Sequence, residues 1–415
     1  MLSLATREFR RETELLQLNQ YHSSDSVARI FEPLNAFLME ASRAPAQKRR
    51  RVEGEVDYIR DADIWLSDGN IIIAVEDPKD RLRAYALKCH RSVLARHSQV
   101  FNTLFTLPQS PEAEEEYDGA PVVRLADPYD DLKSLIQMLY DPLTIPMPGN
   151  YLEEWERDMT KMAGPLRLSA KYELDSFFSR LSDVLETYWP VSLDAWTERT
   201  ETIQSWRQRL KDGKNKIELD LVSLPDPMIA IDLATSTRLS SVLPVAFYDL
   251  HVRTSLSSTI TEKLNGPAPP KDPFLDWEEI LNPLSAAQMY QLMRGREWLR
   301  SIVTRFMTTI LPAELKRPPP DECTIARCPA GKTTTLKLSR GQTRSNRLYI
   351  DPLYGLQTMK EDVQKNLCPG CADRTCQVLE GFREYLWAEM PYFFGLEERK
   401  DGVQYGYDQY LPPDA

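Results

Sequence analysis

Five of the six cysteines lie in the last quarter of this 415-residue chain, at spacings that suit a metal ion. Cys323 and Cys328 are separated by four residues. Cys368 and Cys371 are separated by a Pro-Gly dipeptide, and such a turn aims two thiolates at one ion. Because four thiolates complete a tetrahedral site, the spacing predicts one structural Zn²⁺ held by these four cysteines, with Cys376 as an alternative ligand.

A second interpretation of the same cysteines is that they are reduced and buried as small apolar groups, which is a common fate of cysteine in a folded protein. The separation from Cys328 to Cys368 is longer than compact zinc modules use, and Cys376 makes the ligand set ambiguous. A redox role for the C-x-x-C pair is disfavoured because no thioredoxin-like βαβ pattern surrounds it. Zinc binding and apolar packing both stay open.

The rest of the sequence offers no catalytic constellation. Cys89 and His90 are neighbours at a strand-to-helix junction, so their side chains diverge, and no third member of a triad follows. The Gly331-Lys332-Thr333 tripeptide has Ala326 where a phosphate-binding loop needs glycine. We therefore predict that the protein is not an enzyme, that it has no catalytic residues, and that His90 is a hydrogen-bonded structural residue.

Three short strands open the folded part of the chain. Residues 64–66 and 71–75 are apolar and rich in β-branched residues, and they flank Ser67-Asp68-Gly69-Asn70. The Asp-Gly centre predicts a hairpin turn with positive φ and therefore two antiparallel strands. Residues 83–87 predict a third strand.

The apolar period then changes to that of helices. Residues 93–105 have helical three-and-four spacing, with Ser98 as the cap of a second short helix. An acidic loop over 108–121 precedes a strand at 122–125. Asp127-Pro128 opens a helix with an apolar face that includes Leu135 and Tyr140. This order of elements predicts a compact α+β unit with a short mixed sheet capped by helices.

These residues resemble the BTB (POZ) domain, a dimerising and partner-binding fold without chemistry of its own. The family reads roughly HR-x-x-L-x-x-x-S-x-x-F through its helix pair, followed by a strand and by a helix that ends near L-x-x-x-Y. The matching residues are His90, Arg91, Leu94, Ser98, Phe101, Val123, Leu125, Leu135 and Tyr140. Two departures are Tyr140-Asp141-Pro142, where many members have Tyr-Thr-Gly, and a longer insertion over 143–158. Residues 166–174 and 177–185 resemble the family's closing helix pair.

The chain is similar to fungal BTB-domain proteins in particular, and this similarity extends into the C-terminal half through residues 243–250, the cysteine pairs and residues 390–396. Helical patterns over 193–210, 228–250 (broken near Thr237) and 285–310 make that half mainly α-helical. The predicted parts are a tail with a basic run over 1–56, the BTB/POZ domain over 57–190, a helical domain with the cysteine pairs over 191–397, and a tail over 398–415.

Charge and hydropathy limit the classes of partner that the protein can have. The chain has 51 Lys and Arg against 62 Asp and Glu, so its net charge of −11 argues against a general nucleic-acid-coating role. The sequence lacks an apolar run long enough for a membrane span and a signal peptide, which predicts an intracellular protein without membrane contact. The basic run Lys48-Arg49-Arg50-Arg51 resembles a nuclear-import signal, and it is equally read as a solvated stretch, so nucleus and cytoplasm both stay open.

The resemblance implies a non-catalytic adaptor that forms a homodimer or binds a protein partner through the BTB domain. It also implies, as an alternative, a substrate adaptor of a cullin-type ubiquitin ligase. A further alternative is a zinc-containing nuclear regulator that contacts nucleic acid. Its basic stretch is better read as a solvated loop, because the aromatic residues of nucleic-acid binders are missing from it. That stretch comprises Lys332, Lys337, Arg340, Arg344 and Arg347.

Overall fold

The computed structural model describes residues 56–106, 115–145, 155–211, 226–237, 239–263, 284–316, 328 and 347–398. The predicted N-terminal tail up to residue 55, the C-terminal tail beyond residue 398 and the basic stretch from Lys332 to Arg344 lie outside these residues. Within them, an α+β unit is followed by a helical half, which confirms the predicted fold class. None of the described helices combines the length and the apolar character that crossing a membrane requires.

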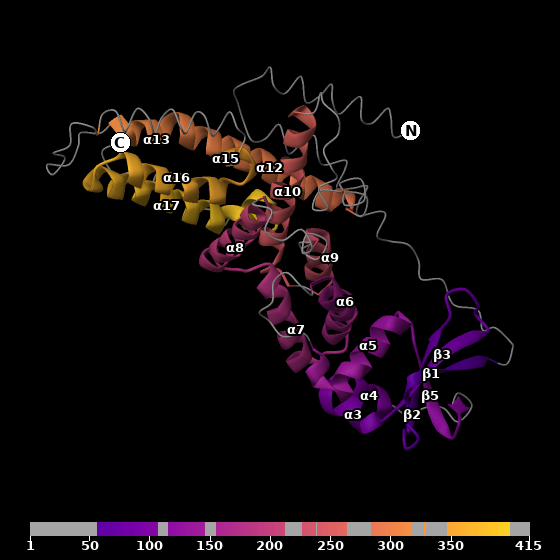
Figure 1. Cartoon of the computed structure of the whole chain (residues 1–415). Coiled ribbons are helices and arrows are strands. Elements are labelled where there is room, and N and C mark those ends of the chain that lie inside the picture. Colours follow the sequence, from indigo (N-terminus) through magenta and orange to yellow (C-terminus); the bar gives the residue numbers. More distant parts are fainter. Residues whose placement is uncertain are drawn as a thin grey trace, which may run out of the picture. The chain divides into compact units, whose positions relative to one another are not determined.

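A five-stranded mixed sheet forms the N-terminal part of the described chain (Figure 1). Its strand order is β1-β3-β2-β5-β4. β1 pairs with β3 in parallel, β2 pairs with β3 antiparallel and with β5 in parallel, and β4 pairs with β5 antiparallel. The strands are β1 (Asp57–Trp65), β2 (Ile71–Glu76), β3 (Arg83–Cys89), β4 (Glu116–Tyr117) and β5 (Ala120–Leu125).

The predicted hairpin between residues 64–66 and 71–75 is wrong, because β3 lies between β1 and β2. Every residue of β2 from Ile71 to Val75 is buried, and such a strand takes a central place with a neighbour on each side. Gly69 also lacks the predicted positive φ. Glycine is favoured here because there is little room for a side chain: a Cβ would lie 3.0 Å from both the Leu66 carbonyl oxygen and Lys88 Cγ.

The Asp-Gly hairpin of this domain lies elsewhere. Asp118 and Gly119 have φ values of 49° and 72°, and they join β4 to β5 near the end of the predicted acidic loop over 108–121. Positive φ at both central residues is what a two-residue hairpin matched to strand twist requires. Local sequence therefore identified the right dipeptide type at the wrong position.

The two faces of the sheet bury different residues. Large side chains such as Ile71, Ile73 and Leu87 face the helices, and Figure 1 shows α3, α4 and α5 beside that face. The opposite face has a small core of its own, which consists of Ile72, Ala74, Ala84, Ala86, Ala120 and Val122. The helices of this part are α3 (Arg91–His97), α4 (Gln99–Thr106), α5 (Tyr129–Tyr140), the 3₁₀ turn η1 (Pro142–Thr144), α6 (Trp155–Lys171) and α7 (Asp175–Tyr188).

Side chains from the two edge strands meet over the small core. The Arg60 guanidinium lies 3.1 Å from Asp118 and 4.7 Å from the centre of the Trp65 ring. The rings of Tyr58 and Tyr117 approach to 4.6 Å, and Lys88 pairs with Asp118 at 2.9 Å. Small residues in the middle of this face, and contacts between side chains across its edges, accompany a curled sheet. The charged side chains at the edges oppose strand addition by other chains.

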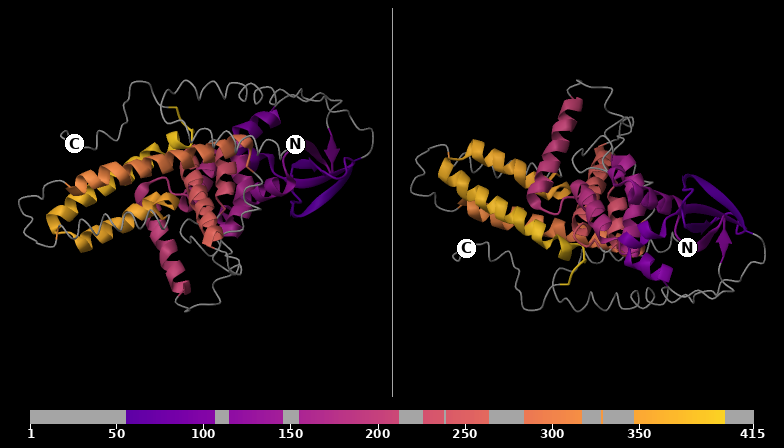
Figure 2. Two further views of the ribbon diagram at one scale, coloured as in Figure 1. Left: turned by 90° about the horizontal axis from the view of Figure 1, so that it is seen from above. Right: turned by 90° about the horizontal axis from the view of Figure 1, so that it is seen from below.

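The second half is helical. The break near Thr237 and the long helix over 285–310 are both confirmed; the latter begins with a capping box between Ser285 and Gln288 and contains a π-helical turn. Figure 2 shows α16 and α17, in yellow, running side by side next to the orange α12 and α13. The helices are α8 (Leu193–Lys211), α9 (Pro227–Thr237), α10 (Leu243–Lys263), α12 (Ala286–Arg305), the π-helix η2 (Phe306–Ile310), α13 (Leu311–Lys316), α15 (Arg347–Ile350), α16 (Pro352–Asn366) and α17 (Pro369–Phe393).

Aromatic stacking fills the layer between these helices. The rings of Phe306 and Phe382 lie 3.9 Å apart and nearly parallel. Phe394 approaches α12 so closely that a Cβ on Gly295 would lie 2.0 Å from its ring, so α12 needs glycine at that position. These contacts hold α17 against α12.

A single buried carboxylate joins three elements. Asp249, on α10, accepts hydrogen bonds from Trp189 Nε1 at 3.1 Å, from Arg199 Nη2 at 3.1 Å and from Arg253 Nη2 at 2.9 Å. Burial by itself raises the pKa of a carboxyl group, but the two guanidiniums outweigh burial and lower the pKa of Asp249. The same burial lowers the pKa of Arg199, because the carboxylate offsets it only in part.

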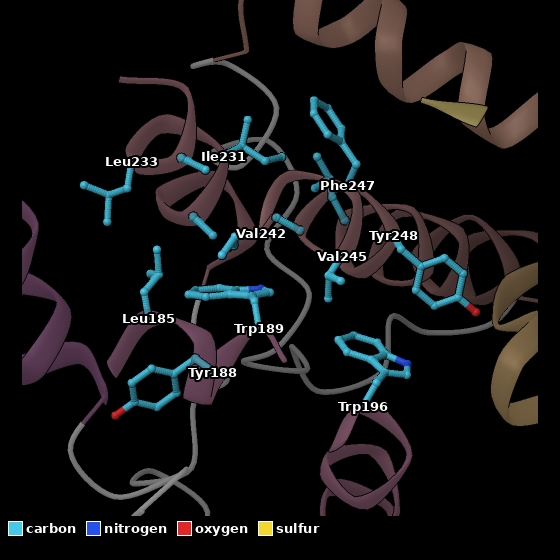
Figure 3. Packing of buried hydrophobic residues seen from close by; sticks show 14 of the residues in the cluster. Leu185, Tyr188, Trp189, Trp196, Ile231, Leu233, Val242, Val245, Phe247 and Tyr248 are labelled. Carbon is cyan, nitrogen blue, oxygen red and sulfur yellow. The ribbon is translucent and has the colours of Figure 1, made fainter. Parts of the chain in front are cut away.

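The packing around Trp189 continues from α7 into the helical half. Figure 3 shows the indole of Trp189 beside Leu185 of α7 and Val242, and it shows Trp196 next to Tyr248. Contacts group the described residues from Val56 onward into one compact unit, and one hydrophobic cluster runs across residue 190. The boundary at residue 190 stays a prediction, and the packing is continuous at this point.

We expect Asp249→Asn to lower the free energy of unfolding by about 3–5 kcal/mol, because two buried guanidiniums lose their counter-charge. Chemical denaturation of the full chain, followed by far-UV circular dichroism, measures the change. Asp232→Asn is the matched control: its side chain is mostly exposed and lies 3.7 Å from Arg167, so its loss costs about 1 kcal/mol or less. Equal effects of the two variants would contradict the role of Asp249.

A pH effect follows from His251, whose side chain is 3 % exposed. Burial, together with the nearby Arg296, lowers its pKa from 6.5 to about 3. Between these values the unfolded chain binds a proton that the folded chain does not, so stability is complete above pH 6.5 and falls by about 1.4 kcal/mol per pH unit below it. Denaturation from neutral pH to about pH 5 measures this slope, and His251→Gln removes its contribution. If the unfolding free energy of the variant depends on pH as steeply as that of the wild type, His251 is not the source of the effect.

Candidate functional site

The residues of the HR-x-x-L motif connect three elements. The Tyr140 hydroxyl, at the end of α5, accepts the His90 backbone N–H at 2.9 Å and lies 2.8 Å from His90 Nδ1. His90 Nε2 lies 3.3 Å from Asp68. Burial raises the pKa of Tyr140, so the hydroxyl keeps its proton. The prediction that His90 is a hydrogen-bonded structural residue is confirmed, and Cys89 beside it is a buried thiol whose pKa burial raises to about 12.

Ser98 acts as the predicted cap and also as a tie. Its Oγ accepts the Phe101 backbone N–H at 3.0 Å and donates to the Tyr172 carbonyl at 2.5 Å. The Phe101 and Tyr172 rings stack at 4.5 Å. The Tyr172 hydroxyl in turn donates to Asp127 at 2.5 Å. One serine therefore joins the start of α4 to the end of α6.

A cavity of about 460 Å³ lies beside α5, and residues from the end of β1, from η1 and from α6 complete its lining. Ile64, Met138 and Leu66 supply buried or half-buried apolar walls, while Gln137 and Lys161 are exposed. The full lining is Asp63, Ile64, Leu66, Ser134, Gln137, Met138, Tyr140, Asp141, Thr144 and Lys161. Apolar walls with exposed polar groups at the margin are the usual makeup of a binding site.

Asp61 holds β1 in place at this cavity. Its carboxylate accepts the backbone N–H groups of Asp63 and Ile64 at 2.8 and 2.7 Å, and it pairs with Lys133 of α5 at 2.9 Å. Burial raises the pKa of Asp61, but hydrogen bonds from Tyr129, Lys133 and the backbone outweigh it and lower the pKa. An ionised, buried carboxylate thus fixes the strand end to α5.

Three of the predicted metal ligands come together. The sulfurs of Cys328, Cys368 and Cys371 all lie within 4.8 Å of one another, and those of Cys328 and Cys368 are 3.5 Å apart. Cys323 lies outside the described residues, so its predicted role as a ligand stays a prediction. Cys376 does not join the group within the described part of the chain; its thiol faces the Lys360 carbonyl at 3.8 Å.

The sequence did not predict the cavity, nor the Asp249 hub, which is the set of hydrogen bonds and ion pairs around Asp249. The cavity is formed by the end of one strand and by helices 70 to 100 positions later, and no local pattern carries that information. For the ion pairs of Asp249, one signal was present in the sequence: Asp249 and Arg253 stand one helical turn apart and follow the mostly apolar run from Leu243 to Tyr248. A charged pair at such a place indicates a buried ion pair.

Residues 70–187 match the model of the BTB/POZ domain family. The matched segment begins just before β2 and ends in the last turn of α7, so it includes the helix pair, the closing helices and the part of the cavity lining that follows β1, while Asp63, Ile64 and Leu66 of that lining precede it. The comparison with curated proteins gave no match for this chain.

We expect Ser98→Ala to lower the free energy of unfolding by about 1–3 kcal/mol, because it removes the cap of α4 and the bond to the Tyr172 carbonyl. Denaturant titration of the full chain measures this change. Ser92→Ala, on the exposed side of α3, is the matched control and costs about 0.5 kcal/mol at most. A cost for Ser98→Ala no larger than that of the control shows that the tie is unimportant.

Proposed function

The chain carries a BTB/POZ domain, which is a protein-interaction module, and we propose that it is a non-catalytic adaptor acting through that domain. BTB domains are typically interaction modules without catalysis. The domain acts here by pairing with a second copy of the chain or by docking another protein.

The observation that carries the proposal is the cavity beside α5 and the leucine next to it. Leu143, in the 3₁₀ turn η1, is 90 % exposed and stands next to Thr144 of the cavity lining. A side chain of this size normally buries apolar area worth about 1.5–3 kcal/mol. An exposed leucine at the margin of an apolar-walled cavity suits a partner that covers both.

The helical half offers a second surface. Tyr290 and Met293 stand three residues apart on α12 and are 49 % and 47 % exposed. Residues three apart on a helix share a face, so this pair forms a small apolar strip. An adaptor needs two surfaces, and the strip supports that part of the proposal.

The alternative functions stay predictions. A nuclear regulator that contacts nucleic acid depends on the basic stretch, of which the residues from Lys332 to Arg344 lie outside the described residues. The import signal depends on Lys48–Arg51, which also lies outside them. Recruitment to a cullin-type ubiquitin ligase rests on the family resemblance alone. Nucleus and cytoplasm both remain predicted locations.

The first test of the proposal is self-association of the full, reduced chain, measured by analytical ultracentrifugation over a wide concentration range. We expect a dimer that Leu143→Asp weakens at least tenfold, because a carboxylate would be buried at the interface. Val191→Asp is the matched control: this residue is also an exposed aliphatic one, and neither of its sequence neighbours lines the cavity, whereas Thr144 beside Leu143 does.

A chain that stays monomeric contradicts the homodimer. Docking of another protein is then examined by proximity labelling in cells, in which Leu143→Asp should lose labelled proteins that Val191→Asp retains. If the two variants give identical results in both experiments, the cavity is not the docking surface and the proposal fails.

A further inference from the structure

We propose that Cys328, Cys368 and Cys371 bind one Zn²⁺, which fastens the chain at Cys328 to the first turn of α17. This inference is independent of the adaptor function, because none of the three cysteines belongs to the segment that matches the BTB/POZ family. It concerns a structural ion, held by sulfur, within the helical half.

The distances fit a shared ion. Zinc binds thiolate at about 2.3 Å, so two sulfurs of one tetrahedral site lie about 3.8 Å apart. Here the Cys328 and Cys368 sulfurs are 3.5 Å apart, and all three sulfurs fall within 4.8 Å of one another. A disulfide needs about 2.05 Å, so the Cys328 and Cys368 sulfurs are too far apart for that bond.

The backbone of α17 prepares two of the ligands. Cys368 is the residue before the helix and is extended, with φ −68° and ψ 158°, and Pro369 starts the helix at its first position. The Ala372 N–H closes the first turn on the Cys368 carbonyl at 2.8 Å, which brings Cys371 round to the same side. The N-terminus of a helix stabilises negative charge, and thiolates are the form that binds zinc.

The three cysteines are buried, and the convergence of their sulfurs separates this site from ordinary apolar packing. Cys328, Cys368 and Cys371 are 2, 4 and 1 % exposed, so all three are shielded from water. Apolar packing alone does not favour contact between sulfur atoms. Two other cysteines pack singly. Cys89 lies in the BTB core among aliphatic side chains, and Cys376 turns to the Lys360 carbonyl.

The three sulfur atoms come from two places that are far apart in the sequence. Cys328 is 40 residues from Cys368 in the sequence. The same end of α17 also holds α13, because Arg374 Nε pairs with the buried Glu314 at 2.7 Å. The ion pair and the metal together attach both α13 and the chain that follows it to α17.

The test is metal analysis of the full chain, purified under reducing conditions without added chelator, together with native mass spectrometry. We expect one Zn²⁺ per chain. Replacement of zinc by Co²⁺ should give the near-ultraviolet charge-transfer absorption of thiolate coordination. Cys371→Ser should weaken Co²⁺ binding at least tenfold, while Cys376→Ser, five residues later on the same helix, should leave it unchanged.

A folded wild-type chain that contains no zinc and gives no thiolate absorption with Co²⁺ overturns the proposal, and so does copper or an iron–sulfur cluster in place of zinc. Equal loss of binding in Cys371→Ser and Cys376→Ser also overturns it. If Cys371→Ser does not fold, the metal content and the cobalt spectrum of the wild type decide. A monomer with one zinc supports this site while contradicting the homodimer, so the two proposals fail separately.

Discussion

The buried carboxylate of Asp249 is the constraint on which the rest of the structure depends. It is the common acceptor for Trp189 at the end of α7, Arg199 on α8 and Arg253 on its own helix. Without it two guanidiniums would be buried with no counter-charge at this point, at a cost of several kcal/mol. Because the partners come from three elements, the carboxylate sets where α8 and α10 lie against α7. Trp196 then packs under the Arg199 guanidinium at 4.6 Å, and Tyr248 packs against Trp196.

Further buried polar links extend this arrangement to the last helices. The Tyr248 hydroxyl donates to Asp351 at 2.8 Å and accepts the Leu353 N–H at 3.1 Å, which ties the start of α16 to α10. Arg383 on α17 bonds to Gln357 of α16 at 3.1 Å and also to Thr197 of α8. Apolar packing is non-directional, and polar links of this kind select one arrangement of helices among several of similar burial. We infer that they define how the helical half assembles on α8.

Local sequence predicted the elements and missed their partners. Helices and capping residues such as Ser98 were found because periodicity and caps are properties of neighbouring residues. The error over strands 64–66 and 71–75 arose because sequence adjacency was taken for sheet adjacency, and nothing local shows that β3 enters between them. The cysteine spacing identified three sulfurs that do converge, because C-x₂-C is itself a local geometry. The Asp249 hub was missed because its donors come from residues 50 and 60 positions away.

The position of α6 explains how an adaptor could hold a partner at a fixed place relative to its helical half. Lys161 of α6 lines the cavity, and Arg167, further along the same helix, pairs with Asp131 of α5 at 3.2 Å and with Asp232 of α9 at 3.7 Å. A Cβ on Gly164 would lie 2.2 Å from Asp131, so α5 and α6 are in close contact beside the cavity. Because closely packed helices compress little and transmit strain, a partner seated beside α5 would be coupled to α9 through α6. The packing and ion pairs of α6 therefore link the cavity to α9, and the proposed adaptor function depends on that link.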